Sequence, residues 1–135
     1  ALSSAASDVY KRQQYNNEKE ELSSIKELIA TYQASAYKSL GIVCKTESQA
    51  CEMADKLQIP DIHFLSNQSS AFVQGIVITS AHMAKGLEFD EVIIPQTDDK
   101  NYHSEIDRSM LYVAVTRAMH RLTLTYSGTK HTPFI

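Results

Sequence analysis

The sequence predicts an α/β domain with a mostly parallel sheet, and two observations support this prediction. Short apolar segments rich in β-branched residues alternate with amphipathic ones, in the order strand, helix, strand, loop, strand. This order is expected when right-handed crossovers connect parallel strands. The central segments 76–79 and 92–95 consist of apolar or β-branched residues, which is typical of strands buried on both faces. We therefore expect a sheet flanked by helices.

No element is expected in the first 13 residues. Residues 1–7 are small and polar, and residues 8–13 read D-V-Y-K-R-Q, which resembles the translated end of a common transposon-based DNA-sequencing library. We interpret residues 1–13 as non-native or disordered, and the sequence as a fragment of a longer gene. An ordinary flexible terminus is the alternative.

The segment 14–37 is expected to hold one amphipathic helix, from about residue 18 to residue 35. Asn17, followed three residues later by Glu20, is typical of a capped helix start. Apolar residues then recur at helical spacing, at Leu22, Ile25, Leu28, Ile29 and Tyr32. This apolar stripe is most simply a surface that docks on the sheet, and contact with a partner helix is the alternative.

The main domain is expected to span residues 38–130, with 131–135 as a truncated tail. Strands are expected at 41–45, 62–65, 76–79, 92–95 and 122–126, and a loop is expected at 66–70. One helix is expected to start at the segment 46–49 and to run to about Gln58, and another is expected to run from Ile106 to Met119. The first of these helices starts with a capping box, T-E-S-Q, and ends before Pro60.

Composition limits the function classes. At 135 residues the chain fits one domain, and its formal net charge of −3 means that any contact with nucleic acid must come from a local patch. No apolar run approaches the roughly 18 residues of a membrane span. Cys44 and Cys51 lack metal-ligand spacing, as do the five histidines. We expect reduced thiols in a cytoplasmic protein, with no metal site and no membrane partner.

Two features suggest a charged site. His82, Lys85, Gly86 and Glu88 lie between the central strands, and open α/β sheets place ligands at the ends of buried strands. Arg117 follows apolar residues at helical spacing, and a guanidinium there needs an anionic partner or an opening to solvent. The alternative for Arg117 is that it satisfies the last carbonyls of its helix.

These residues carry a resemblance to a known family. H-M-A-K-G-L-E-F-D-E-V at 82–92 resembles motif V of superfamily 1 helicases of the UvrD, Rep and PcrA type, and D-R-S-M-L-Y-V-A-V-T-R-A at 107–118 resembles their motif VI. A looser similarity reaches back to Gly41. The resemblance implies the second RecA-like motor domain, with a three-layer fold of the P-loop NTPase type, in the short form of HelD-like proteins.

In this family ATP binds between two motor domains, which move single-stranded DNA across both. The resemblance implies that Arg117 is catalytic and reaches the γ-phosphate. It implies ATP contacts for Lys85, Gly86 and Glu88, DNA contacts for Ser80 and His82, and supporting roles for Arg108, Tyr112 and Thr116. The alternatives are a solvated loop pair for Lys85 and Glu88, a satisfied strand-end histidine for His82, and core packing for Tyr112.

The chain contains no G-x-x-x-x-G-K-[ST] motif and no carboxylate pair suited to magnesium. The cofactor implied is ATP with Mg²⁺, the metal being bound by an N-terminal motor domain that this chain lacks. We therefore expect the chain alone to be inactive and its parent to be an ATP-dependent DNA helicase. The alternatives are a non-catalytic module that binds nucleic acid or RNA polymerase, part of an AddA- or RecB-like helicase–nuclease, and a purely structural domain.

Overall fold

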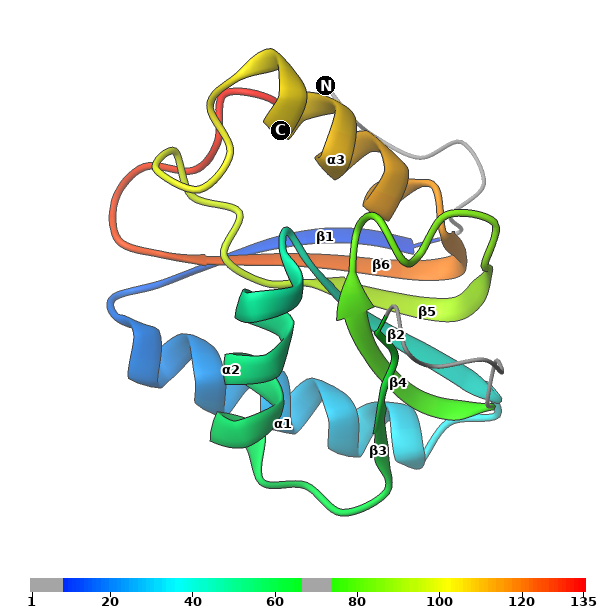
Figure 1. The fold of residues 1–135 in the computed structure, drawn as a ribbon. Helices are drawn as coiled ribbons and strands as arrows, with labels where there is room; N and C mark the ends of the chain where they lie inside the picture. The colour runs from blue at the N-terminus through cyan, green and yellow to red at the C-terminus, as the bar shows by residue number, and fades with distance from the viewer. Residues whose placement is uncertain (1–8, 67–73) are drawn as a thin grey trace.

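Six parallel strands form one sheet, in the order β1-β6-β5-β2-β4-β3 (Figure 1). The structure is a computed structural model that describes residues 9–66 and 74–135. Within them the strands are β1 (Val9–Tyr15), β2 (Ser39–Cys44), β3 (Ile62–Phe64), β4 (Gly75–Ser80), β5 (Phe89–Ile94) and β6 (Ala118–Ser127). The predicted parallel sheet is confirmed. Most of the loop expected at 66–70 lies outside the described residues.

Helices lie on both faces of the sheet and make three layers (Figure 1). α1 (Glu18–Gln33) and α2 (Glu47–Leu57) cover one face, and α3 (Glu105–Val115) covers the other. Each face has its own apolar core, because successive strand residues point to opposite sides of a sheet. In β2, Ile42 belongs to the core beneath α1 and α2, while Val43 belongs to the core beneath α3. The expected three-layer arrangement is confirmed.

Side chains cap the start of all three helices. The side chain of Asn17 accepts a hydrogen bond from a first-turn N–H of α1, and Thr46 forms the predicted capping box with Gln49 at α2. A second capping box, Ser104 with Asp107, begins α3. Each cap satisfies backbone N–H groups that the first helical turn leaves without partners.

Strand β1 corrects the expectation of disorder for residues 9–13. These residues pair in parallel with β6, from Val9 opposite Arg121 to Tyr15 opposite Ser127. The pairing uses backbone groups at the edge of the sheet, so V-Y-K-R-Q-Q-Y carries little of the apolar pattern that marks a buried strand. The non-native origin of residues 1–13 stays a prediction.

The C-terminal residues 131–135, expected to be a truncated tail, pack against the domain, and their truncation stays a prediction. Asp98 and His131 form an isolated antiparallel bridge. Thr132 is buried, and its hydroxyl donates to the carbonyl oxygen of Tyr102 at 2.8 Å. The final two residues pack against the core beneath α3.

Helix α3 ends at Val115, before the expected end at Met119, and Thr116 is its C-cap. Strand pairing stops the helix here, because the N–H of Phe89 in β5 donates to the carbonyl oxygen of Arg117 at 2.9 Å. Arg117 therefore lies in the short turn between α3 and β6, and the prediction that it sits inside a helix is wrong.

Candidate functional site

The candidate residues lie along the connection between β4 and β5, residues 81–88, which crosses the sheet without a helix. Ser80, at the end of β4, pairs with Cys44 of β2, whereas Glu91 of β5 pairs with Leu40. Since β5 starts two residues before Glu91, its start is level with position 38 of the chain. This is six residues, or about 20 Å, from the end of β4 along the strand direction. The connection therefore joins the edge of the sheet at which the parallel strands end to the opposite edge, at which they begin.

Arg117 lies at the edge where β5 and β6 begin. Its Nε donates to the carbonyl oxygen of Val113 at 3.1 Å, and its Nη1 donates to that of Leu87 at 3.3 Å. Its Nη2 donates to the hydroxyl of Thr116 at 3.2 Å. All three acceptors are neutral, and no carboxylate within residues 9–66 and 74–135 pairs with this half-buried guanidinium.

These contacts bring the two motifs together. Leu87 belongs to the motif V connection, and Arg117 contacts it through the side chain while binding Phe89 through the backbone. The bond to Val113 is also the helix-end contact expected if Arg117 only satisfies the carbonyls of α3. A partly buried charge with neutral acceptors alone is suited to an anionic ligand.

Gly86 and its neighbours are open to solvent. Gly86 has φ +79°, a conformation that glycine adopts at no steric cost, and an added Cβ would meet no atom within 4 Å. Lys85 and Glu88 are exposed, and neither forms an ion pair with another described residue. The structure places Glu88 at the same edge as Arg117, immediately before β5.

His82 and Lys85 lie on one side of a hollow of about 160 Å³ whose other side is made by the exposed face of α3, including Ile106 and Met110. Ser80 is different, because it is buried and its hydroxyl accepts a hydrogen bond from the N–H of Met83 at 3.3 Å. Ser80 thus shapes the turn after β4. The expected direct contact of Ser80 with DNA stays a prediction.

The three expected supporting residues differ in their surroundings. Thr116 donates to the carbonyl oxygens of Tyr112 and Val113, at 3.0 Å each, and accepts from Arg117. The side chain of Tyr112 is exposed, so the alternative of core packing is wrong for it. Arg108 forms an exposed pair with Glu105 at 3.7 Å, away from Arg117.

Sequence reasoning missed a partly buried ion pair that joins α3 to the end of β2. Lys45, directly after β2, lies 2.9 Å from Asp107 in the first turn of α3. Burial opposes the ionisation of Asp107, but Lys45 and the N–H groups of His103 and Ser104 outweigh it and hold the pKa of Asp107 well below its usual value. The capping-box spacing could have identified Asp107 as a cap, but nothing in the sequence pairs it with Lys45.

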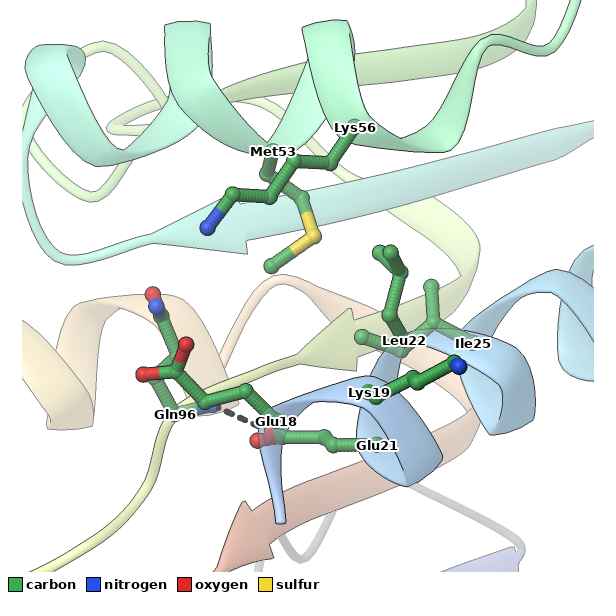
Figure 2. A pocket seen from close by; sticks show the side chains of 8 residues that line it. All are labelled: Glu18, Lys19, Glu21, Leu22, Ile25, Met53, Lys56 and Gln96. Carbon is green, nitrogen blue, oxygen red and sulfur yellow. Dashed lines mark hydrogen bonds between the residues drawn. The ribbon is translucent and has the colours of Figure 1, made fainter.

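A second cavity, of about 260 Å³, lies between α1 and α2 on the face away from α3 (Figure 2). Figure 2 shows Met53 of α2 opposite Leu22 of α1, and Glu21 joined by a hydrogen bond to Gln96. The buried carboxylate of Glu21 also accepts from the hydroxyl of Thr125 at 2.7 Å. Burial raises the pKa of Glu21, and these bonds partly oppose the rise. Glu21 thus ties α1 to the sheet, remote from Arg117.

Within residues 9–66 and 74–135, no three His, Cys, Asp or Glu side chains are grouped so that they could hold a metal ion. In the same part of the chain, no helix has the length and apolar character to cross a membrane.

Comparisons with known proteins agree with the fold and the motifs. The chain is 34% identical over 73 residues to DNA helicase II of Escherichia coli, and 41% identical over 58 residues to the Gabija protein GajB of Bacillus cereus. These matches cover 47% and 43% of the chain but only 10% and 12% of the relatives, so the chain spans a small part of their length.

Two solved structures have the same fold. The C-terminal domain of a possible DNA helicase from Lactobacillus plantarum matches with a TM-score of 0.80 and 25% identity, over 95% of this chain and 79% of that one. An arterivirus helicase, nonstructural protein 10, solved as a complex with DNA, matches with a TM-score of 0.54 and 14% identity, over 97% of this chain and 32% of that one.

The model of the UvrD-like helicase C-terminal domain matches residues 4–129, nearly the whole chain. Together with the parallel three-layer fold and the junction of the two motifs at Arg117, this match shows that the chain belongs to the UvrD-like helicase C-terminal domain family.

Proposed function

We propose that this domain supplies the second wall of an inter-domain ATP site in an ATP-dependent DNA helicase, with Arg117 as its catalytic residue. One observation carries the proposal. The guanidinium of Arg117 is held against the motif V connection at Leu87 by neutral acceptors, with no carboxylate of the described residues to balance its charge. A structural arginine at such a position gains from a carboxylate partner, whereas a phosphate-binding arginine must stay available.

The surrounding residues fit a nucleotide phosphate. A guanidinium has five N–H donors, and Arg117 uses three of them within the domain, so two remain for an anion. Gly86 exposes its backbone to close approach, since neither a side chain nor a neighbouring atom covers it. Lys85 and Glu88 are exposed and unpaired among the described residues, which leaves one cation and one hydrogen-bond acceptor near the same connection.

In the mechanism that we propose, bound ATP with Mg²⁺ supplies the phosphoryl group, and the metal is held by the other motor domain. Arg117 donates to the γ-phosphate and stabilises the charge that develops during transfer. Its bonds to Val113 and Thr116 orient the guanidinium before ATP arrives, so little reorganisation is needed. Glu88 accepts a hydrogen bond from the ribose hydroxyl, and Lys85 interacts with a phosphate of the nucleotide.

The opposite edge of the sheet is proposed to contact single-stranded DNA. His82 is exposed there, beside the hollow along α3. Two similar proteins support this role. One is named DNA helicase II, and the arterivirus helicase was solved as a complex with DNA. With a net charge of −3, binding is expected to be local, salt-sensitive and directed at phosphates.

The test measures ATPase activity in the full-length parent protein. Arg117→Ala is expected to lower kcat by about 10³-fold, because arginine fingers contribute this much or more. Arg117→Lys keeps the charge but loses the planar fork, so it should recover only a small part of the rate. Lys100→Ala, a change of an exposed lysine in the connection before α3, is the matched control and should leave kcat unchanged. Wild-type kcat in Arg117→Ala would rule out the catalytic role.

A non-catalytic module is the second candidate function, and the bond from Arg117 to Val113 favours it, since a helix-end arginine needs no ligand. Such a module would keep the motor fold and bind nucleic acid or RNA polymerase. It predicts that Arg117→Ala lowers the melting temperature, and that a parent containing both motor domains hydrolyses no ATP. The catalytic role predicts that Arg117→Ala leaves the melting temperature nearly unchanged, and that a parent containing both motor domains hydrolyses ATP.

A further inference from the structure

A bulge in β6 lies directly beside Arg117. Phe89 of β5 pairs with Ala118, but Glu91 pairs with Arg121, so three residues of β5 face four of β6. An added residue in a strand reverses the side-chain direction of everything on one side of it. Arg117 immediately precedes the paired segment, and its carbonyl oxygen is held by the N–H of Phe89. The direction of the Arg117 side chain therefore depends on the bulge.

One aromatic ring contacts two neighbouring residues of the bulge. His120 stacks on Tyr37 with ring centroids 5.6 Å apart and an angle of 2° between the planes. The guanidinium carbon of Arg121 lies 4.9 Å from the centroid of the same ring. Consecutive residues of a regular strand point to opposite faces, so one ring reaches both only because the strand is irregular here. Tyr37 lies between α1 and β2, and it fastens the bulge to a distant part of the chain.

A buried carboxylate completes the arrangement. Nη1 of Arg121 lies 3.2 Å from Oε1 of Glu91, which is fully buried, and Oε2 of Glu91 has no hydrogen-bond partner among the described residues. Burial raises the pKa of Glu91, and Arg121 opposes that rise. Moving Arg121 away would leave a buried carboxylate without its counter-charge, so the pair resists any slip of β6 relative to β5.

We propose that Tyr37, Glu91 and Arg121 form a clamp that holds the β6 bulge and thereby positions Arg117 for ATP hydrolysis. The proposal rests on the proposed function of Arg117 and goes beyond it, since none of the three residues is among the proposed ATP contacts, although Glu91 lies near the end of the motif V segment 82–92. They act through the backbone of β6, so they are positioning residues.

The first test needs no nucleotide. The Nε–H of Arg117, which donates to Val113, can be followed by NMR in this chain. Tyr37→Leu removes the ring but leaves the ion pair between Glu91 and Arg121, so the fold is kept. It is expected to shift the Arg117 signal and to speed its exchange with water by about tenfold or more, because the local bond opens more often. An unchanged Arg117 signal in Tyr37→Leu contradicts the clamp.

Two matched variants separate the clamp from a general loss of stability. Phe64→Leu is an equivalent aromatic change on β3, at the far edge of the sheet from β6, and should leave the Arg117 signal unchanged. Tyr37→Phe keeps the ring and should keep the wild-type signal. If Phe64→Leu moves the signal as much as Tyr37→Leu does, or if Tyr37→Phe behaves like Tyr37→Leu, the clamp is wrong.

The second test uses the ATPase of the full-length parent. Tyr37→Leu should lower kcat about 10- to 100-fold with the KM for ATP nearly unchanged, because a misplacement of about 1 Å costs this much rate. Arg121→Lys keeps a charge beside Glu91 but loses the planar contact with Tyr37, and it should lower kcat in the same direction. Wild-type kcat in both variants would overturn the clamp. If Arg117→Ala itself keeps wild-type kcat, the proposed function fails, while the NMR test still decides whether Tyr37 holds Arg117.

Discussion

At the scale of single residues, Asp107 is a charge with a structural role. It caps α3 through the N–H groups of His103 and Ser104, both at 3.1 Å, and it pairs with Lys45. The carboxylate therefore balances the partial positive charge of the helix N-terminus and the positive charge of a lysine from another element at the same time. Its role is to hold the start of α3, and with it the whole of motif VI, over the end of β2.

Asp107→Asn is expected to lower the free energy of unfolding by about 3 kcal/mol at pH 7, because it leaves Lys45 without its partner in a largely buried position. Since the pKa of Asp107 in the folded state lies below its usual value, its contribution is fully present above that usual value and is lost as the pH falls toward the folded-state pKa. Urea unfolding at pH 7 and at pH 3 measures this. The gap between wild type and variant should shrink at pH 3, and Asp55→Asn, on the exposed face of α2, should show no gap at either pH.

At the scale of elements, the packing of β2 against β5 depends on one glycine. An added Cβ at Gly41 would lie 2.6 to 2.8 Å from ring atoms of Phe89, which is fully buried beneath α3. Because Phe89 starts β5 and binds the backbone of Arg117, its ring cannot move without disturbing the edge that carries the candidate site. Gly41 is therefore needed for space rather than for an unusual backbone conformation.

Gly41→Ala is expected to cost about 2 kcal/mol of stability by overpacking this contact. Phe89→Leu alone also destabilises, since it leaves a cavity. The double variant should be more stable than the sum of the two changes predicts, because the smaller side chain makes room for the methyl group. Thermal unfolding of the four proteins in this cycle measures the coupling, and strictly additive losses would show that the steric contact is not the cause.

At the scale of the whole molecule, the two candidate sites lie at opposite edges of the sheet, and eight residues join them. His82 follows the end of β4, and Glu88 precedes the start of β5. No helix intervenes, so the connection 81–88 is the direct covalent route between the proposed DNA contact and the proposed ATP contact. A motor requires its two ligands to be coupled, and a short connection is suited to that task.

His82→Ala in the full-length parent is expected to weaken binding of single-stranded DNA about tenfold at low salt, since it removes a polar contact to phosphate. The dissociation constant for ATP should stay within about twofold, because His82 makes none of the contacts that hold Arg117. Fluorescence anisotropy with a labelled oligonucleotide and a labelled nucleotide measures the two affinities. The reverse pattern would assign His82 to the nucleotide site.

The sequence by itself determined the fold class and the candidate residues. Apolar strand runs and the capping box at Thr46 are local patterns, so they predict elements without knowledge of distant contacts. Motifs V and VI are likewise contiguous, which is why the family could be identified from them.

Only the tertiary structure decided where those residues lie. Strand pairing with Phe89 ended α3 early and placed Arg117 in a turn, and the same pairing gave the polar edge strand β1 its partner. The burial of Ser80 and the clamp around Arg121 likewise depend on segments far apart in the sequence. Local periodicity carries no information about such partners, because backbone pairing and buried charge are settled only when distant segments meet.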